Sequence, residues 1–249
     1  MPDSDPPEMP PPALPPPEGQ QYAITRENLA DGSLLARIRA EAPEALRFQT
    51  EAELDVDLAR TMAALPADSD LWLFGYGSLI WNPVIDYAER RVATIHGYHR
   101  SYCLWLHLGR GSPERPGLML ALDHGGSCSG VAFRIPRDQA MGEMRLVWRR
   151  EMAGRAYKAR WVTAHTPEGP VRALTFVIDR TYPRYAGKLP DAEIAARIST
   201  ASGSLGSCVA YLSDTIGALA ALGLRDRMLD RIASRIADID PQLAASASP

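Results

Sequence analysis

The segment that decides how this chain folds is Leu71-Trp72-Leu73-Phe74-Gly75-Tyr76-Gly77-Ser78-Leu79-Ile80-Trp81. Its apolar start, bounded by turn residues, predicts a strand buried on both faces. Gly75 and Gly77 then let the backbone turn tightly and approach another group without a Cβ in the way. Backbone N–H groups at such a turn converge into a small concavity that suits a carboxylate or a developing oxyanion. The alternative is a tight turn that binds nothing, and the flanking aromatic residues weigh against it.

The composition of the whole chain limits its size class and its partners. Its 249 residues are 46% hydrophobic and 23% charged, enough to bury a core in one domain or at most two small ones. The formal charge of −3 argues against nucleic acid or an anionic membrane surface as the main partner. No stretch reaches the roughly 18 consecutive apolar residues that span a bilayer. The N-terminus also lacks the basic start and apolar core of a signal peptide.

Cysteine and histidine usage gives no sign of a metal or disulfide framework. Cys103, Cys128 and Cys208 are widely scattered without CxxC spacing, which predicts a reducing, cytoplasmic compartment. Cys103 is expected to be a small core residue, because nothing nearby in the sequence lowers its thiol pKa. Cys128 and Cys208 lie in Gly/Ser-rich stretches that are interpreted as turns, where exposure is compatible with the sequence. The histidines show no ligand spacing, so no metal site is predicted.

Changes in composition divide the chain into four parts. Residues 1–20 are proline-dense and are expected to form a disordered arm, with docking of a polyproline II segment on a partner as the alternative. Residues 21–70 carry helical patterns and are interpreted as a helical N-terminal extension. Residues 71–240 are expected to form the functional domain, and residues 241–249 a frayed tail.

The residue patterns of the functional domain predict a sheet flanked by helices. Segments rich in β-branched and aromatic residues, separated by Gly/Pro turns, predict strands at residues 92–95, 98–108, 117–123, 130–135, 157–166 and 171–178. Helices are expected at residues 137–152, 191–202, 207–222 and 225–239. Short strands joined by hairpin-length turns favour a closed or nearly closed antiparallel sheet. The predicted fold class is therefore α+β, a small mixed or antiparallel β-barrel flanked by helices.

Glu151 is the strongest candidate for a chemical role. In the helix that interrupts the strands, Ala140, Met144 and Val147 form an apolar stripe, and the same spacing continues to Glu151. A glutamate on a buried stripe must be paired or have a raised pKa, because burying its charge is costly. A raised pKa is what a general base needs near neutral pH. The alternative, equally compatible with the spacing, is a structural ion pair with Arg149, Arg150, Arg155 or Lys158.

Several short motifs together resemble the ChaC family of glutathione-specific γ-glutamylcyclotransferases. The resemblance rests on their content and order: Phe-Gly-Tyr-Gly-Ser-Leu-Ile-Trp-Asn-Pro (74–83), Gly-Tyr-His-Arg (97–100), Arg-Pro-Gly-Leu (115–118), Gly-Val-Ala-Phe-Arg (130–134), Arg-Glu-Met (150–152), Tyr-Pro-Arg-Tyr-Ala-Gly (182–187) and Ala-Ser-Gly (201–203). It covers residues 71–239, and the segments before residue 70 lie outside it.

The resemblance implies a β-barrel, a catalytic residue and a substrate site. It assigns Glu151 as the catalytic glutamate and identifies the substrate loop as Gly75, Tyr76, Gly77, Ser78, Leu79 and Ile80. The nearest matches to the tyrosines that line the family's cavity are Tyr182 and Tyr211. Relatives often carry an asparagine shortly before the last tyrosine, where this chain has Ser207-Cys208-Val209-Ala210-Tyr211, so the assignment of Tyr211 is weaker. No cofactor or metal is implied, and the expected partner is a small-molecule substrate.

The implied reaction suits an enzyme with one acid/base residue. The α-amine of a γ-glutamyl group attacks its own γ-carbonyl, which closes 5-oxoproline and expels Cys-Gly from glutathione. Because nucleophile and electrophile share one molecule, the protein has mainly to fold the substrate and move a proton. Two alternatives remain open: a cyclotransferase for other γ-glutamyl amines or amino acids, and a non-catalytic binding module that regulates cation transport.

Overall fold

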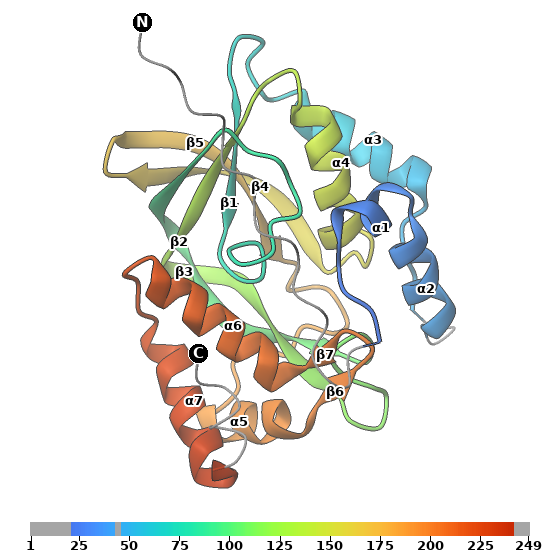
Figure 1. The fold of residues 1–249 in the computed structure, drawn as a ribbon, viewed down its shortest axis with the longest axis vertical. Helices are drawn as coiled ribbons and strands as arrows, with labels where there is room; N and C mark the ends of the chain where they lie inside the picture. The colour runs from blue at the N-terminus through green and yellow to red at the C-terminus, as the bar shows by residue number, and fades with distance from the viewer. Residues whose placement is uncertain (1–20, 43–45, 242–249) are drawn as a thin grey trace, which may run out of the picture.

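The computed structural model describes residues 21–42 and 46–241, so the predicted proline-rich arm and the tail from residue 242 lie outside the described residues. Five strands close into a barrel in the order β1-β3-β2-β4-β5 (Figure 1). The strands are β1 (Leu71–Gly75), β2 (Glu89–Leu106), β3 (Gly117–Ile135), β4 (Tyr157–Thr166) and β5 (Gly169–Ile178). Strand β1 pairs antiparallel with β3 and parallel with β5. The predicted class, a small barrel flanked by helices, is confirmed.

The two longest strands correct the sequence interpretation. Segments 92–95 and 98–108 are one strand, β2, and segments 117–123 and 130–135 are one strand, β3. The predicted turn at residues 124–127 is wrong, because β2 and β3 stay paired on both sides of this stretch. Gly97, Gly125 and Gly126 have positive φ there, and the register shifts between His96 and Tyr98. These glycines therefore bend a continuous ladder instead of ending it.

The cysteines are all free and all buried. Cys128 lies inside β3 with 3% of its surface exposed, and Cys208 begins helix α6 (Cys208–Ala221) with 1% exposed. The interpretation of both as turn residues was wrong, because small residues that suggest a turn also fit a crowded strand or helix start. Cys103 is a core residue, as predicted.

Four helices lie along one side of the barrel: α1 (Arg26–Ala30), α2 (Ser33–Glu41), α3 (Glu51–Met62) and α4 (Ala140–Glu151) (Figure 1). Thr25 and Thr50 begin α1 and α3 with capping boxes, so each helix start has its amides satisfied. In α4 the predicted apolar stripe is buried, and Trp148 packs edge-on against Phe176 of the barrel. Helix α4 is thus fixed to the barrel by its apolar face.

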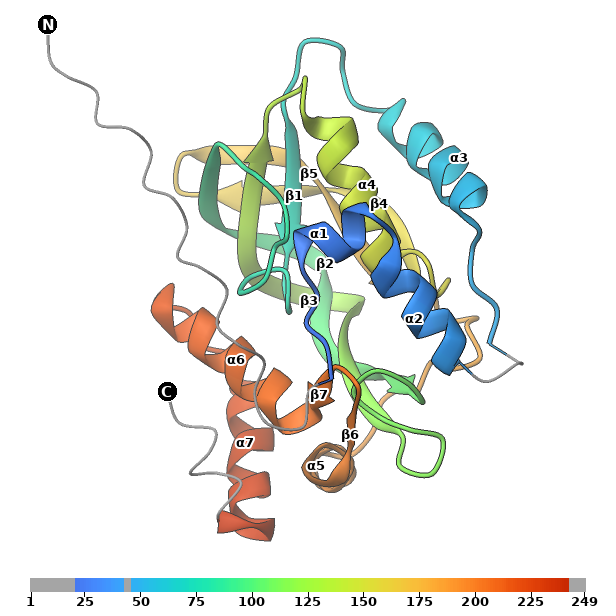
Figure 2. The same cartoon turned by 45° about the vertical axis from the view of Figure 1, so that its right-hand side comes forward.

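Helix α3 lies against the outer side of α4 (Figure 2). The Trp148 indole N–H donates to Asp57 at 3.1 Å, and Arg149 pairs with Glu51 at 2.9 Å. Just before α3, the Gln49 side chain donates to the Met152 carbonyl at 2.8 Å. Contacts from α3 and the residues just before it therefore fix the C-terminal end of α4.

The remaining helices form a group at the other end of the barrel (Figure 2). They are α5 (Asp191–Thr200), α6 and α7 (Arg227–Ile239), with α5 packed against α7. Two-residue strands β6 (Ser202–Gly203) and β7 (Gly206–Ser207) connect α5 to α6. A Cβ on Gly203 would lie 2.4 Å from the Gly109 carbonyl oxygen, so this connection packs closely on the β2–β3 loop.

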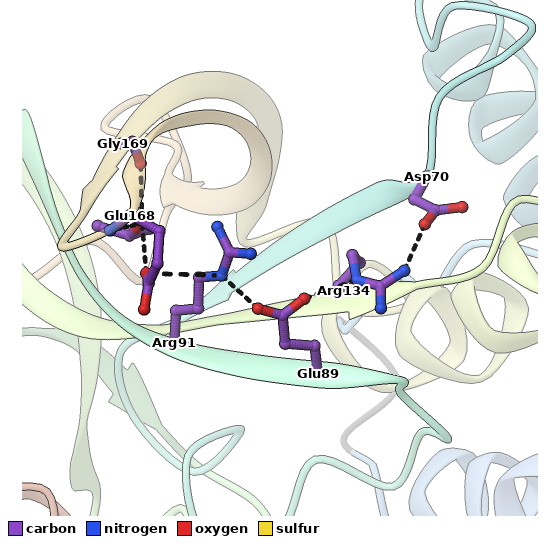
Figure 3. A network of polar contacts seen from close by, with 7 residues as sticks. Asp70, Glu89, Arg91, Arg134, Glu168 and Gly169 are labelled. Carbon is purple, nitrogen blue, oxygen red and sulfur yellow. Dashed lines mark hydrogen bonds and ion pairs between the residues drawn. The ribbon is translucent and has the colours of Figure 1, made fainter. Parts of the chain in front are cut away.

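A chain of ion pairs ties the barrel strands together on the surface (Figure 3). Arg134 of β3 pairs with Asp70, just before β1, at 2.7 Å and with Glu89 of β2 at 2.8 Å. Glu89 also pairs with Arg91, which lies 3.6 Å from Glu168 in the β4–β5 turn. These pairs link β2 and β3 to the residue before β1 and to the β4–β5 turn.

Candidate active site

The predicted substrate loop directly follows the buried strand β1. Residues 75–80, here called the glycine loop, turn through a hydrogen bond from the Ile80 amide to the Gly77 carbonyl at 2.9 Å. The next turn closes from the Asn82 amide to the Ser78 carbonyl at 2.8 Å. A Cβ on Gly75 would lie 3.0 Å from Leu79 Cβ, so only glycine fits there without displacement. Tyr76, Leu79 and Ile80 are buried and anchor the loop in the core.

Glu151 is the last residue of α4, and its side chain is only 15% exposed. Burial raises the pKa of its carboxyl above the ordinary value of 4.5, and the charge of Arg150 opposes that rise. Arg150 Nε lies 3.2 Å from Glu151 Oε1. Both properties expected from the sequence are therefore present together: a raised pKa and an ion-pair partner.

Arg150 joins Glu151 to the glycine loop. Its side chain is 5% exposed and donates to Ser78 Oγ at 2.7 Å and to the Asn82 carbonyl at 2.5 Å. Burial lowers its pKa. One guanidinium thus contacts the loop and the carboxylate, so two features that lie far apart in the sequence meet in one place.

Tyr211, from the first turn of α6, closes the site above the loop. A Cβ on Gly77 would lie 2.7 Å from the Tyr211 hydroxyl oxygen. The ring packs edge-on against Trp81 at 6.1 Å between centroids, and the Arg110 guanidinium lies 5.5 Å from its centroid. Burial raises the pKa of Tyr211 to about 12, and the nearby charge of Glu151 adds to the rise. The hydroxyl therefore remains a proton donor at neutral pH.

Two further buried phenols surround the carboxylate. Burial raises the pKa of Tyr76 and of Tyr157 well above 10, and the charge of Glu151 contributes in both cases. Tyr157 begins β4 and its hydroxyl lies 3.5 Å from the Leu120 carbonyl. The site is thus a carboxylate among three neutral phenols and two arginines, Arg150 and Arg110.

Tyr182 occupies a neighbouring position. It packs in the cluster that contains Ala156 and Tyr185, and its hydroxyl accepts from Arg184 at 2.9 Å. Tyr157 packs against both this cluster and the main core, which contains Leu79 and Ile80 of the glycine loop. No contact among the described residues joins Tyr182 to Glu151, and its place in the site stays a prediction.

Sequence reasoning missed Tyr157 and Arg110. Tyr157 was treated only as a strand residue. Arg110 lies between two glycines, in the connection between the strands expected at residues 98–108 and 117–123, and it reaches Tyr211 because the β2–β3 loop folds onto α6. An arginine between two glycines is a weak signal on its own, since exposed turns contain the same pattern.

The described residues show neither a metal cluster nor a membrane-spanning helix. Within residues 21–42 and 46–241, no three His, Cys, Asp or Glu side chains are grouped so that they could hold a metal ion. Over the same part of the chain, every helix is too short or too polar to cross a bilayer.

Comparison with solved structures defines the class of fold. A yeast γ-glutamylcyclotransferase specific to glutathione superposes with a TM-score of 0.60 at 20% identity, over 73% of this chain and 98% of the yeast chain. A second crystal structure described in the same terms gives a TM-score of 0.61 at 21% identity. The protein thus has the γ-glutamylcyclotransferase fold.

Sequence comparison then identifies the family. The family model described as ChaC-like protein matches residues 71–238, and the chain belongs to this family. The glutathione-specific γ-glutamylcyclotransferase of Escherichia coli K12 is 37% identical over 204 residues, which is 82% of this chain and 87% of the relative. Human glutathione-specific γ-glutamylcyclotransferase 1 is 34% identical over 147 residues, 57% of this chain and 66% of the relative. The resemblance expected from the motifs is confirmed.

Proposed function

We propose that this protein is a γ-glutamylcyclotransferase that cleaves glutathione to 5-oxoproline and Cys-Gly. The observation that carries the proposal is the position of Glu151, a largely buried carboxylate with a raised pKa, linked through Arg150 to the glycine loop. The relatives named for this activity support the choice of substrate.

The reaction begins with proton removal from the substrate. A free α-amine has a pKa of about 8 and is largely protonated at neutral pH, so a base must accept a proton before or during attack. Glu151 is that base, because burial brings its pKa closer to neutrality. The amine nitrogen then bonds to the γ-carbonyl carbon to form a tetrahedral intermediate. As the bond from that carbon to the cysteine nitrogen breaks, protonated Glu151 gives its proton to the leaving amine. The regenerated carboxylate then takes the second proton from the ring nitrogen and passes it to the same amine, so that 5-oxoproline keeps one N–H and Cys-Gly leaves as an ammonium.

The glycine loop holds the γ-glutamyl end of the substrate. Its backbone N–H groups and the Arg150 guanidinium offer donors to the α-carboxylate or to the oxyanion that forms at the γ-carbonyl. The phenols of Tyr76 and Tyr211 remain protonated and add donors without adding negative charge. Held this way, the flexible chain is folded so that its amine approaches its own carbonyl, which is the main requirement of an intramolecular reaction.

Glu151→Gln tests the role of the carboxylate against a matched control. Glutamine keeps the size of the side chain but accepts no proton, so turnover of reduced glutathione should fall about 10²- to 10⁴-fold. The control is Glu143→Gln, a second buried glutamate of α4, which pairs with Arg26 at 2.5 Å on the side of the N-terminal helices. It should lose stability but retain kcat. Mass spectrometry of 5-oxoproline and Cys-Gly gives the rates.

The outcomes separate substrate from mechanism. A loss below about tenfold in Glu151→Gln would reject the glutamate as the base. If the unmodified protein leaves glutathione intact but cyclises another γ-glutamyl amine or amino acid, the reaction stands and the substrate is wrong. If no γ-glutamyl compound reacts, the protein is a binding module with this fold.

The predicted organisation and location belong to the same proposal. Residues 71–240 form the catalytic part, and residues 21–70 an extension that supports α4 through contacts such as Trp148–Asp57. The substrate is a small molecule rather than a nucleic acid, in keeping with the formal charge of −3. A cytoplasmic location is favoured by the three free thiols.

A further inference from the structure

Arg100 of β2 has a buried guanidinium that the proposed reaction does not use. Its side chain is 3% exposed, and each of its three nitrogen atoms has a separate partner. Nε donates to the Tyr76 carbonyl at 2.7 Å, and Nη2 donates to the Ser129 carbonyl at 2.8 Å. Nη1 pairs with the carboxylate of Asp226. The planar fork of an arginine fixes three directions at once, so this contact set determines where the Tyr76 carbonyl points.

The contact with the Tyr76 carbonyl sets the orientation of the Tyr76–Gly77 peptide in the glycine loop. In a trans peptide the carbonyl oxygen and the following N–H point in opposite directions. A Tyr76 carbonyl held on Arg100 therefore turns the Gly77 N–H to the opposite side of the peptide. In the part of the chain that the structure describes, this N–H donates to no protein acceptor. It is a donor available to a ligand, in the loop that meets Arg150 and Tyr211.

Asp226 makes the arginine a fixed part of the fold. One carboxylate oxygen pairs with Arg100, and the other accepts from the Met228 and Leu229 amides as the N-cap of α7. A buried guanidinium without a counter-charge is unfavourable, so Asp226 is what allows a cation behind the loop. The N-terminus of α7 and the glycine loop are thereby held in one arrangement.

We propose that Arg100 is a positioning residue for the cyclotransferase reaction. Held by Asp226, it fixes the Tyr76–Gly77 peptide so that the Gly77 N–H is directed at the substrate. The inference rests on the proposed function for its catalytic consequence, but the orientation of the peptide can be measured without any substrate.

Arg100→Lys tests the proposal, because it keeps the charge but removes the fork. The matched control is Arg134→Lys. Arg134 also lies on a barrel strand and pairs with carboxylates, those of Asp70 and Glu89, but it has no hydrogen bond or ion pair to the glycine loop. Displacing a substrate-positioning group by about 1 Å lowers turnover by about 10²-fold, so kcat of Arg100→Lys should fall between about 10- and 100-fold. The acid limb of its pH profile should not move, because Glu151 is untouched. Arg134→Lys should keep kcat within about twofold.

The second measurement is independent of activity. The ¹⁵N–¹H resonance and the hydrogen exchange rate of the Gly77 amide should change clearly in Arg100→Lys and stay at their original values in Arg134→Lys. If Arg100→Lys fails to fold, Asp226→Asn replaces it: asparagine is also a good N-cap, but it removes the counter-charge. Asp226→Asn should likewise change the resonance and the exchange rate of the Gly77 amide and lower kcat.

The outcomes distinguish this inference from the proposed function. An unchanged Gly77 amide in the folded variant overturns the positioning role, whatever the substrate. A changed amide with an unchanged kcat on glutathione also overturns it. If the parent protein does not cleave glutathione at all, the proposed function fails. The amide measurement then decides alone whether Arg100 orients the loop.

Discussion

Replacing Gly77 by alanine probes the contact that closes the site. The new Cβ would lie 2.7 Å from the Tyr211 hydroxyl oxygen and 3.9 Å from its Cζ atom. Gly77 does not have a positive φ, so alanine adopts its backbone conformation without strain. The whole effect of the substitution therefore comes from one steric contact with one oxygen atom.

The size of the effect follows from how firmly Tyr211 is held. To restore a contact of about 3.5 Å, the hydroxyl must move back by roughly 0.8 Å. The side chain is 3% exposed and is confined by Trp81 and Arg110, so it cannot swing aside freely. Overpacking of this kind lowers the free energy of unfolding by about 1–3 kcal/mol. For a chain of this size, each kcal/mol lowers Tm by about 2–4 °C.

A double-mutant cycle with Tyr211→Phe isolates the contact. Phenylalanine removes the oxygen, and the nearest atom to the new Cβ is then the ring carbon Cζ at 3.9 Å, an ordinary van der Waals distance. By itself Tyr211→Phe should lower the free energy of unfolding by no more than about 1 kcal/mol, because it removes one polar atom and keeps the packed ring. Gly77→Ala should cause little or no further loss in the Tyr211→Phe background, so the coupling should equal its effect in the parent protein, about 1–3 kcal/mol.

Urea denaturation of the four proteins measures this coupling. If the two single effects add within about 0.5 kcal/mol, the residues do not interact and the geometry of the loop described here is wrong. A destabilised Gly77→Ala that is rescued by Tyr211→Phe supports the arrangement of the Tyr211 hydroxyl directly over Gly77.

Three further predictions address charge and burial. Glu151 has a raised pKa, so above its ordinary value of 4.5 the native state binds more protons than the unfolded state and stability falls as pH rises. Glu151→Gln should remove this fall, and parallel pH dependences of the two unfolding free energies would contradict it. Arg134→Gln loses both ion pairs and should lower the unfolding free energy by about 0.5–1 kcal/mol at low salt and by less at high salt; an effect that is insensitive to salt would argue against the network. Burial raises the pKa of Cys103 to about 12 and those of Cys128 and Cys208 to about 11. Iodoacetamide should therefore label the cysteines only in denaturant, and rapid labelling of the native protein would show that they are accessible.

The sequence predicted the fold where local signals are strong and independent of their neighbours. Both the apolar run of β1 and the periodic stripe of α4 fold as expected, because the run is short and bounded by turn residues and the stripe repeats at helical spacing. The predicted breaks in β2 and β3 were wrong, because a glycine with positive φ permits either a turn or a bend. Pairing between the two strands, a tertiary property, selects the bend.

The candidate site was predicted only in part. Glu151 and the glycine loop were found because one violates an apolar pattern and the other interrupts a strand. Arg110 was not assigned a role, because nothing in its local sequence distinguishes it from an arginine in an exposed turn. Arg100 appeared only as the last residue of the Gly-Tyr-His-Arg motif (97–100), which indicates the family but not what the side chain contacts. Their significance depends on which groups surround them after folding.

The sequence by itself therefore determined the order of elements, the buried strand, the anomalous glutamate and the family. Only the tertiary structure decided that Arg150 connects Glu151 to Ser78, that Tyr211 lies over Gly77, and that Arg100 holds the loop from behind. The physical reason is that a local pattern reports which face of an element is buried, whereas a site forms from side chains on separate elements. Which of these side chains meet is set by closure of the barrel and by the helices packed against it.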